Sequence, residues 1–126
     1  MVSWNNDDFK ILSDLQLKTG VKAKDVIMLE NDIIFLVKPE DVKKFTPELN
    51  RAFKKKVVFL QDCETPIEMI KKWLGLDSIE LKETGNTIMV KVDERKRGAV
   101  IGRGGWSISI LNTVLKKKFG VLAKVV

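Results

Sequence analysis

The sequence contains no histidine and no tyrosine, and it has a single cysteine, Cys63. Without histidine, catalytic systems in which an imidazole activates a serine or cysteine nucleophile are excluded, and so are histidine metal sites. One cysteine allows neither an internal disulfide nor a cysteine metal cluster. The acidic residues show no paired spacing that suggests general acid and base catalysis. The composition therefore predicts a protein that is not an enzyme and that needs no metal, no other cofactor and no small-molecule substrate.

Long hydrophobic runs are also missing. No apolar stretch approaches the roughly 20 residues that a membrane span needs, and the acidic, polar residues 1–8 do not resemble a signal peptide. A lone thiol fits a reducing compartment. We therefore expect a cytoplasmic protein with no membrane partner. Its 126 residues, 44% of them hydrophobic, suffice for one ordinary domain or two small ones.

Negative charge is scarce towards the end of the chain. Residues 91–126 contain nine Lys and Arg and only two acids, a net charge of +7. The imbalance is local, because residues 1–62 hold eleven basic and ten acidic residues (+1), whereas residues 63–126 hold twelve and seven (+5). Runs such as 116–118 are commonly solvated helix ends. The clustering as a whole nevertheless favours a polyanionic partner.

The hydrophobic pattern gives one order of elements, helix–strand–strand–helix–helix–strand, twice. In the first pass, Phe9, Leu12 and Leu15 lie on one side of a helix that Gly20 ends. Helices are predicted over residues 6–19, 39–45 and 47–54, and strands over 26–29, 33–37 and 56–60. The sequence therefore predicts a first unit over residues 1–62.

The second pass begins at a predicted capping box, with Thr65 as N-cap, Pro66 in the first turn and Glu68 as the reciprocal partner. Ile67, Ile70, Trp73 and Leu74 would give this helix its apolar face. Strands are predicted over residues 78–82, 87–92 and 121–126, and two further helices over 94–101 and 105–119. These elements predict a second unit over residues 63–126 and an α+β class for both units.

The two later helices of the second unit are separated by Gly102-Arg103-Gly104-Gly105. Glycines let a chain of phosphates lie directly against the main chain, because no side chain stands in the way. The helix that follows offers free N–H groups and the positive end of its dipole, and Arg103 adds a formal charge. This stretch is the best candidate for a site that binds a phosphate backbone.

Residues from Asp93 to Leu111 resemble the nucleic-acid-binding segment of a KH domain. They combine an acidic cap, Gly98 in the first helix and the pattern Val-Ile-Gly-x-x-Gly-x-x-Ile-x-x-Leu, which starts at Val100. The element order is similar to that of type II KH domains. Two such domains in tandem resemble the archaeal NusA-like transcription factors over essentially the whole chain. Other type II KH proteins share the pattern, including a ribosomal small-subunit protein and a ribosome-assembly GTPase.

The resemblance implies, in each unit, a three-stranded mixed sheet with helices on one face. It implies a protein that binds single-stranded RNA and acts in transcription termination, antitermination or elongation. The phosphates of about four nucleotides would lie on the loop, with bases in an apolar groove. Trp106 would stack on a base or seal the joint between the units. The implied RNA-binding residues are Gly102, Arg103, Gly104, Gly105, Arg95, Lys96, Arg97, Ile101, Trp106 and Ile108.

The first unit departs from this pattern, since Phe45-Thr46-Pro47 stands where the glycine loop should be. Thr46 is predicted to cap the next helix directly, so we expect a degenerate KH unit that supports the second one without gripping RNA. These residues include no counterpart of the polymerase-binding domain of bacterial NusA, so the resemblance implies no contact with polymerase. Polymerase or another transcription protein stays open as a partner. Two alternatives stay open, a ribosome-associated or RNA-processing adaptor and a protein-interaction scaffold with vestigial RNA binding.

Overall fold

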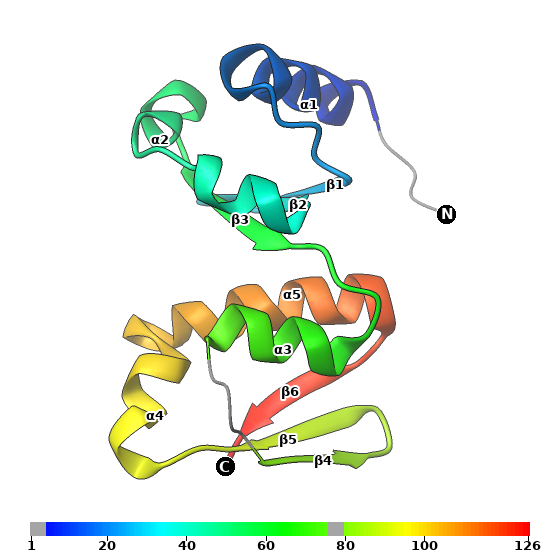
Figure 1. The fold of residues 1–126 in the computed structure, drawn as a ribbon, viewed down its shortest axis with the longest axis vertical. Coiled ribbons are helices and arrows are strands. Elements are labelled where there is room, and N and C mark those ends of the chain that lie inside the picture. The colour runs from blue at the N-terminus through cyan, green and yellow to red at the C-terminus, as the bar shows by residue number, and fades with distance from the viewer. Residues whose placement is uncertain (1–4, 76–79) are drawn as a thin grey trace. The chain divides into compact units, whose positions relative to one another are not determined.

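The computed structural model describes residues 5–75 and 80–126 and divides into two compact units, Met1–Asp62 and Cys63–Val126 (Figure 1). Each unit is α+β and contains one three-stranded mixed sheet. In both sheets the middle strand pairs antiparallel with the strand before it and parallel with the strand after it. A parallel pair needs a crossover, and in each unit helical segments supply it.

The elements of the first unit follow the predicted order. They are α1 (Asn6–Thr19), β1 (Asp25–Met28), β2 (Asp32–Val37), a 3₁₀ helix η1 (Pro39–Lys44), α2 (Glu48–Phe53) and β3 (Lys56–Gln61). The sheet order is β1-β2-β3. The predicted strands are therefore confirmed to within one residue at each end, and the first of the two short helices is a 3₁₀ helix.

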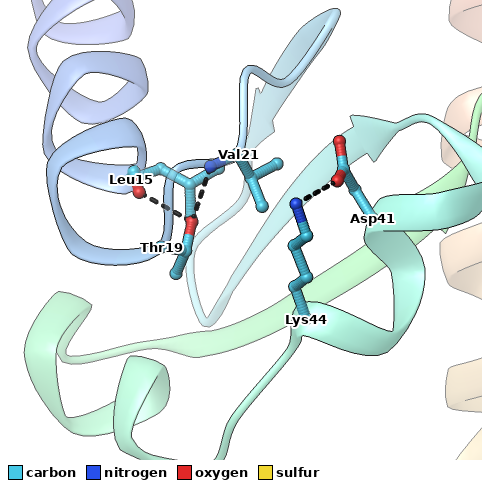
Figure 2. A network of polar contacts seen from close by, with 5 residues as sticks. All are labelled: Leu15, Thr19, Val21, Asp41 and Lys44. Atoms are coloured by element: carbon cyan, nitrogen blue, oxygen red, sulfur yellow. Dashed lines mark hydrogen bonds and ion pairs between the residues drawn. The ribbon is translucent and has the colours of Figure 1, made fainter.

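Helix α1 begins and ends where its sequence directs. Asn5 and Asp8 form a reciprocal capping box, and Gly20 ends the helix in the left-handed conformation with φ +77°. Thr19 secures the exit, since its hydroxyl donates to the Leu15 carbonyl and accepts from the Val21 amide (Figure 2). These bonds fix the path from α1 into the sheet.

The apolar face of α1 differs from the prediction at one position, because Phe9 is 53% exposed. Leu15 is fully buried, and Ile11 and Leu12 pack against the same core. With about 100° of rotation per residue, Ile11 and Leu12 lie within about 60° of Leu15 around the helix, whereas Phe9 is about 120° away. Phe9 therefore falls outside the stripe that faces the sheet.

Alternate residues of the first sheet build the core beneath the helices. Phe35 lies at its centre, with its ring 5.7 Å from that of Phe53 and 6.0 Å from that of Phe59. The buried members of this cluster are Leu15, Val21, Val26, Ile33, Phe35, Val37, Leu49, Val57 and Phe59. Residues of the opposite face, among them Ile34, Leu36 and Leu60, are also buried. Both faces of this sheet are therefore apolar, as the near-continuous hydrophobic runs of β2 and β3 require.

The turn between η1 and α2 corrects one detail of the prediction. The N-cap of α2 is Pro47, which makes no side-chain cap bond, and Thr46 takes part through its carbonyl, which accepts from the Leu49 amide at 3.1 Å. Proline at this point already holds a helical φ, so the helix starts without a hydroxyl cap.

An ion pair lies within η1, where the Lys44 ammonium is 2.8 Å from the Asp41 carboxylate (Figure 2).

The second unit repeats the order, with a shorter first helix and longer second and third helices. Its elements are α3 (Pro66–Leu74), β4 (Glu80–Thr84), β5 (Thr87–Lys91), α4 (Glu94–Ile101), a 3₁₀ turn η2 (Arg103–Gly105), α5 (Trp106–Phe119) and β6 (Leu122–Val125). The sheet order is β4-β5-β6, and α3 and α5 lie on one side of it (Figure 1). Residues 78 and 79 of the predicted first strand lie outside the described residues.

The core of the second unit lies between α3, α5 and the inner sheet face. The Thr65 hydroxyl accepts from the Glu68 amide, which is one of the two bonds of the predicted capping box. In α3 the fully buried residues are Met69 and Ile70, so the apolar face is turned from the predicted one towards Met69. In α5 the buried residues are Ile110, Leu111, Val114 and Leu115, whereas Ile108 is half-buried.

Asn112 ties α5 to the last strand of this sheet. Its side-chain amide donates to the Ala123 carbonyl at 3.1 Å and accepts from the Ala123 amide at 2.7 Å. One side chain thus satisfies both backbone groups of an edge-strand residue. The bond pair fixes the height of α5 over the sheet, and with it the position of the glycine loop at the start of α5.

Candidate nucleic-acid interface

Helix α4, which leads into the loop, carries three exposed cations in its N-terminal half. Asp93 is its N-cap, as predicted, with its carboxylate accepting from the Arg95 amide at 3.2 Å. Arg95, Lys96 and Arg97 follow in the first turns, and all are exposed. At the other end the Gly102 amide donates to the Gly98 carbonyl at 2.9 Å and closes the helix.

Gly102 is the point at which the chain turns most tightly. Its φ of +81° and ψ of 171° belong to a backbone region that essentially only glycine adopts. A β-carbon placed there would lie 2.7 Å from the backbone nitrogen of Ser107 and 2.7 Å from its Cβ. The first glycine of the loop is therefore required both by backbone conformation and by close contact with the first turn of α5.

Gly104 and Gly105 differ from Gly102 because they are surrounded by open space. Both have positive φ, +61° and +78°, yet a β-carbon at either would meet no atom within 4 Å. The Gly105 amide donates to the Gly102 carbonyl at 3.1 Å, so the loop is one ordered turn. These glycines leave the main chain of the loop uncovered, which is the access that a phosphate backbone needs.

The start of α5 has no side-chain cap. Gly105 is its N-cap and offers no side-chain acceptor, and the first turn contains no acidic residue. The Trp106 amide donates to the Arg103 carbonyl, so it is the helix dipole, with no acidic side chain in the first turn, that favours an anion at this end. The sequence-based prediction of a helix start beside the loop is confirmed, with the helix beginning at Trp106.

The positive charges of the second unit are more dispersed than the sequence indicated. Arg95, Lys96, Arg97 and Arg103 are exposed, and no ion pair within the described residues joins them to a carboxylate. Residues 116–118, in contrast, end α5, whose 14 residues extend over about 21 Å. Lys91 and Lys124 lie on the sheet face opposite the core, by strand register. The net charge of +7 is therefore not gathered at the loop: Arg103 lies in it, and Arg95, Lys96 and Arg97 lie in the N-terminal half of the helix before it.

The apolar residues predicted for the groove lie at both ends of the loop. Ile101, the last residue of α4, and Ile108, in the first turns of α5, are half-buried. Their neighbours Val100 and Ile110 are buried and belong to the core. Ile101 and Ile108 thus keep part of their surface exposed at the two ends of the loop.

Trp106 packs within the second unit against Trp73, which the sequence placed on the apolar face of its helix. Its ring centroid is 6.2 Å from that of Trp73 in α3, with an interplanar angle of 53°. The indole N–H of Trp73 donates to the Ser107 carbonyl at 2.9 Å. Both rings are half-buried. A partly buried indole N–H usually has a hydrogen-bond acceptor, so the sequence could indicate that Trp73 has one. It could not indicate that this acceptor is the Ser107 carbonyl.

The corresponding place in the first unit has a different chemistry. A shallow pocket of about 500 Å³ lies there, lined by Lys18, Thr19, Lys44, Thr46, Glu48, Leu49 and Ala52. Its Lys44 is paired with Asp41, which is only 8% exposed, and Glu48 faces the same pocket. The pocket has no glycine backbone and no excess of unpaired cations. It therefore lacks the features that the loop at Gly102 offers to phosphates.

Comparison with known proteins identifies a relative by shape. No protein-family model and no curated protein sequence matches the chain. Among the solved structures similar to it is the crystal structure of APE1850, with 26% sequence identity and a TM-score of 0.80 over 98% of this chain and 99% of that one. The α+β architecture is therefore shared over the whole length of both chains. The name of that protein states no function.

Within residues 5–75 and 80–126, no group of three or more Cys, Asp or Glu side chains is placed to hold a metal ion. Within the same residues, no helix is both long and apolar enough to cross a membrane.

Proposed function

We propose that this chain is an RNA-binding protein of the NusA type, made of two type II KH units, which acts in transcription termination, antitermination or elongation in the cytoplasm. Single-stranded RNA lies with its phosphates on the loop from Gly102 to Gly105, and its bases reach the apolar surface of Ile101 and Ile108. The protein binds and positions RNA without a chemical step. Polymerase or another transcription protein is a further partner under this proposal.

The uncovered main chain at Gly104 and Gly105 supports this function most directly. Three properties occur together there: open space over the backbone, a helix start without a side-chain cap, and Arg103, which forms no ion pair within the described residues. Three more exposed cations, Arg95, Lys96 and Arg97, lie on the preceding helix. Phosphates need all three properties, because the backbone amides donate to their oxygens and the cations neutralise their charge. The parallel strands on either side of the crossover hold these groups on rigid elements.

A scaffold role for the first unit has its own support. Phe45 packs inward, with its ring 5.8 Å from that of Phe59, and Lys44 is held by Asp41. The residues that replace the glycine loop therefore serve the fold of that unit.

A ribosome-associated or RNA-processing adaptor would use the same loop for other transcripts. Identification of the RNAs crosslinked to the protein in cells therefore separates that role from one in transcription.

RNA binding should be weak and strongly dependent on salt. Each phosphate neutralised on a single strand releases a condensed counterion and contributes about −0.7 to the slope of log K against log salt concentration. With Arg103 in the loop and three cations on the helix before it, none in an ion pair within the described residues, we expect a slope of about −2 to −3. Fluorescence anisotropy with a labelled single-stranded RNA, titrated at several salt concentrations, measures it. A slope near zero would contradict a grip on the RNA backbone.

Charge reversal should separate the two units. We expect Arg95→Glu with Arg97→Glu to weaken RNA binding about tenfold or more, because both are exposed on the helix that leads into the loop, where acids would repel phosphates, and because acids in the first turns of α4 remain compatible with the helix. The matched control is Lys38→Glu with Lys43→Glu: Lys38 precedes η1 and Lys43 lies within it, both are exposed, and neither belongs to the Lys44–Asp41 pair. It carries the same change in net charge and should cost less than about threefold, through the long-range field alone. An equal loss from both pairs would mean that the first unit also contacts RNA.

A further inference from the structure

We infer that Trp73, in α3, is a positioning residue. It lies outside the glycine loop but holds this loop in the conformation that binds RNA. This inference rests on the proposed function for its consequence in binding. Its structural part concerns the protein alone and is testable without RNA.

The contact joins the last turn of α3 to the first turn of α5. Trp73 is the second-last residue of α3, and its indole N–H donates to the Ser107 carbonyl at 2.9 Å across 34 residues of sequence. The same indole packs on the ring of Trp106 at 6.2 Å. Two neighbouring residues of α5 are thus held by one side chain, once by a directed bond and once by ring contact.

Ser107 is also the residue against which the loop turns. The backbone of Gly102 approaches it so closely that a β-carbon would lie 2.7 Å from the Ser107 nitrogen. The indole bond and the tight turn therefore share one residue. If Ser107 moves, Gly102 loses the surface against which its unusual conformation is packed.

The loop needs such an external support because its own restraints are few. Gly102, Gly104 and Gly105 all have positive φ, and glycine loses more conformational freedom on ordering than any other residue. The N-cap of α5 makes no side-chain bond. An ordered loop lets the phosphates bind without that entropic cost, so a side chain that orders it strengthens binding while touching no RNA.

Trp73→Phe is the direct test. It keeps an aromatic ring against Trp106 and removes only the N–H donor. We expect hydrogen exchange of the amides in residues 103–109 to become about tenfold faster in the free protein, with exchange in the first unit unchanged. Affinity for a single-stranded RNA should fall about fivefold, the size of one net hydrogen bond. The salt slope should stay as in the unmodified protein, because no phosphate contact is lost.

The readouts separate this inference from the proposed function. If the unmodified protein binds no RNA, the proposed function fails, while the exchange data still decide whether Trp73 orders the loop. Unchanged exchange in residues 103–109 of the folded variant overturns the role of Trp73 whatever the RNA result. If the variant does not fold, hydrogen exchange of the Trp73 indole N–H in the unmodified protein decides the question. Slow exchange with solvent supports the bond to Ser107, and exchange as fast as that of a free indole overturns it.

Leu17→Ala, at the most exposed large hydrophobic residue of α1, is the control and should alter neither loop exchange nor RNA affinity.

Discussion

Replacement of Arg103 and Gly104 by aspartate should abolish RNA binding while the protein stays folded. The double variant removes one cation and places two carboxylates on the most exposed part of the loop. Like charges brought together at an interface cost several kcal/mol, so the affinity should fall at least about 100-fold. RNA titration measures the loss, and circular dichroism and thermal unfolding establish that the fold is retained.

The geometry of the loop explains why this variant should fold. A β-carbon at Gly104 meets no atom within 4 Å, and aspartate is among the residues that tolerate its left-handed conformation. Arg103 has no ion pair to lose in the described residues. Arg103→Asn with Gly104→Asn is the matched neutral control, since asparagine has the size of aspartate and tolerates the left-handed conformation, and it should lose only about tenfold. A folded aspartate variant that binds RNA as tightly as the unmodified protein would show that the loop is not the site.

Gly102→Ala should destabilise the second unit more than any other single alanine in the loop. The new methyl group would meet the Ser107 backbone nitrogen at 2.7 Å, and φ of +81° with ψ of 171° is unfavourable for alanine. Strain of this kind costs about 1–3 kcal/mol, and overpacking adds about as much. We expect a loss of about 3 kcal/mol in the free energy of unfolding, measured by urea denaturation.

Gly104→Ala provides the comparison, because Gly104 lacks both the close contact and the glycine-only backbone conformation of Gly102. Its φ is also positive, but its β-carbon would point into open space. Only the left-handed conformation opposes it, at about 1 kcal/mol. If the two variants proved equally stable, the close contact between Gly102 and Ser107 would not be a feature of the protein in solution.

The element order was predictable because its signals are local. Gly20, Gly75 and Gly120 end helices in the left-handed conformation, and Asp93 caps α4, so the boundaries are encoded next to where they occur. The errors concern rotation about a helix axis. Phe9 was predicted on the apolar face of α1 and is exposed, whereas Met69 was left out of the apolar face of α3 and is buried. Apolar residues occur on more than one side of each helix, and only the position of the sheet decides which side is buried.

The candidate site was predicted in part for the same reason. Its glycines and cations are contiguous in sequence, so Gly102, Arg103 and Gly105 could be identified together. Trp73 lies 34 residues from its acceptor, and no short pattern connects the two. The distribution of charge was misjudged, because a count along the chain cannot tell that residues 116–118 lie a whole helix away from the loop.

The pair of indoles beside the loop also gives the protein a built-in optical reporter. Since tyrosine is absent, tryptophan dominates the near-ultraviolet absorption, and two of the three tryptophans are Trp73 and Trp106. Chromophores whose centroids lie 6.2 Å apart, with planes inclined by 53°, couple in their electronic transitions and give a circular dichroism signal that depends on their mutual orientation. A ligand that settles on the glycine loop therefore acts on the first turn of a helix that carries one of these chromophores. The near-ultraviolet spectrum then follows occupancy of the loop with no label attached.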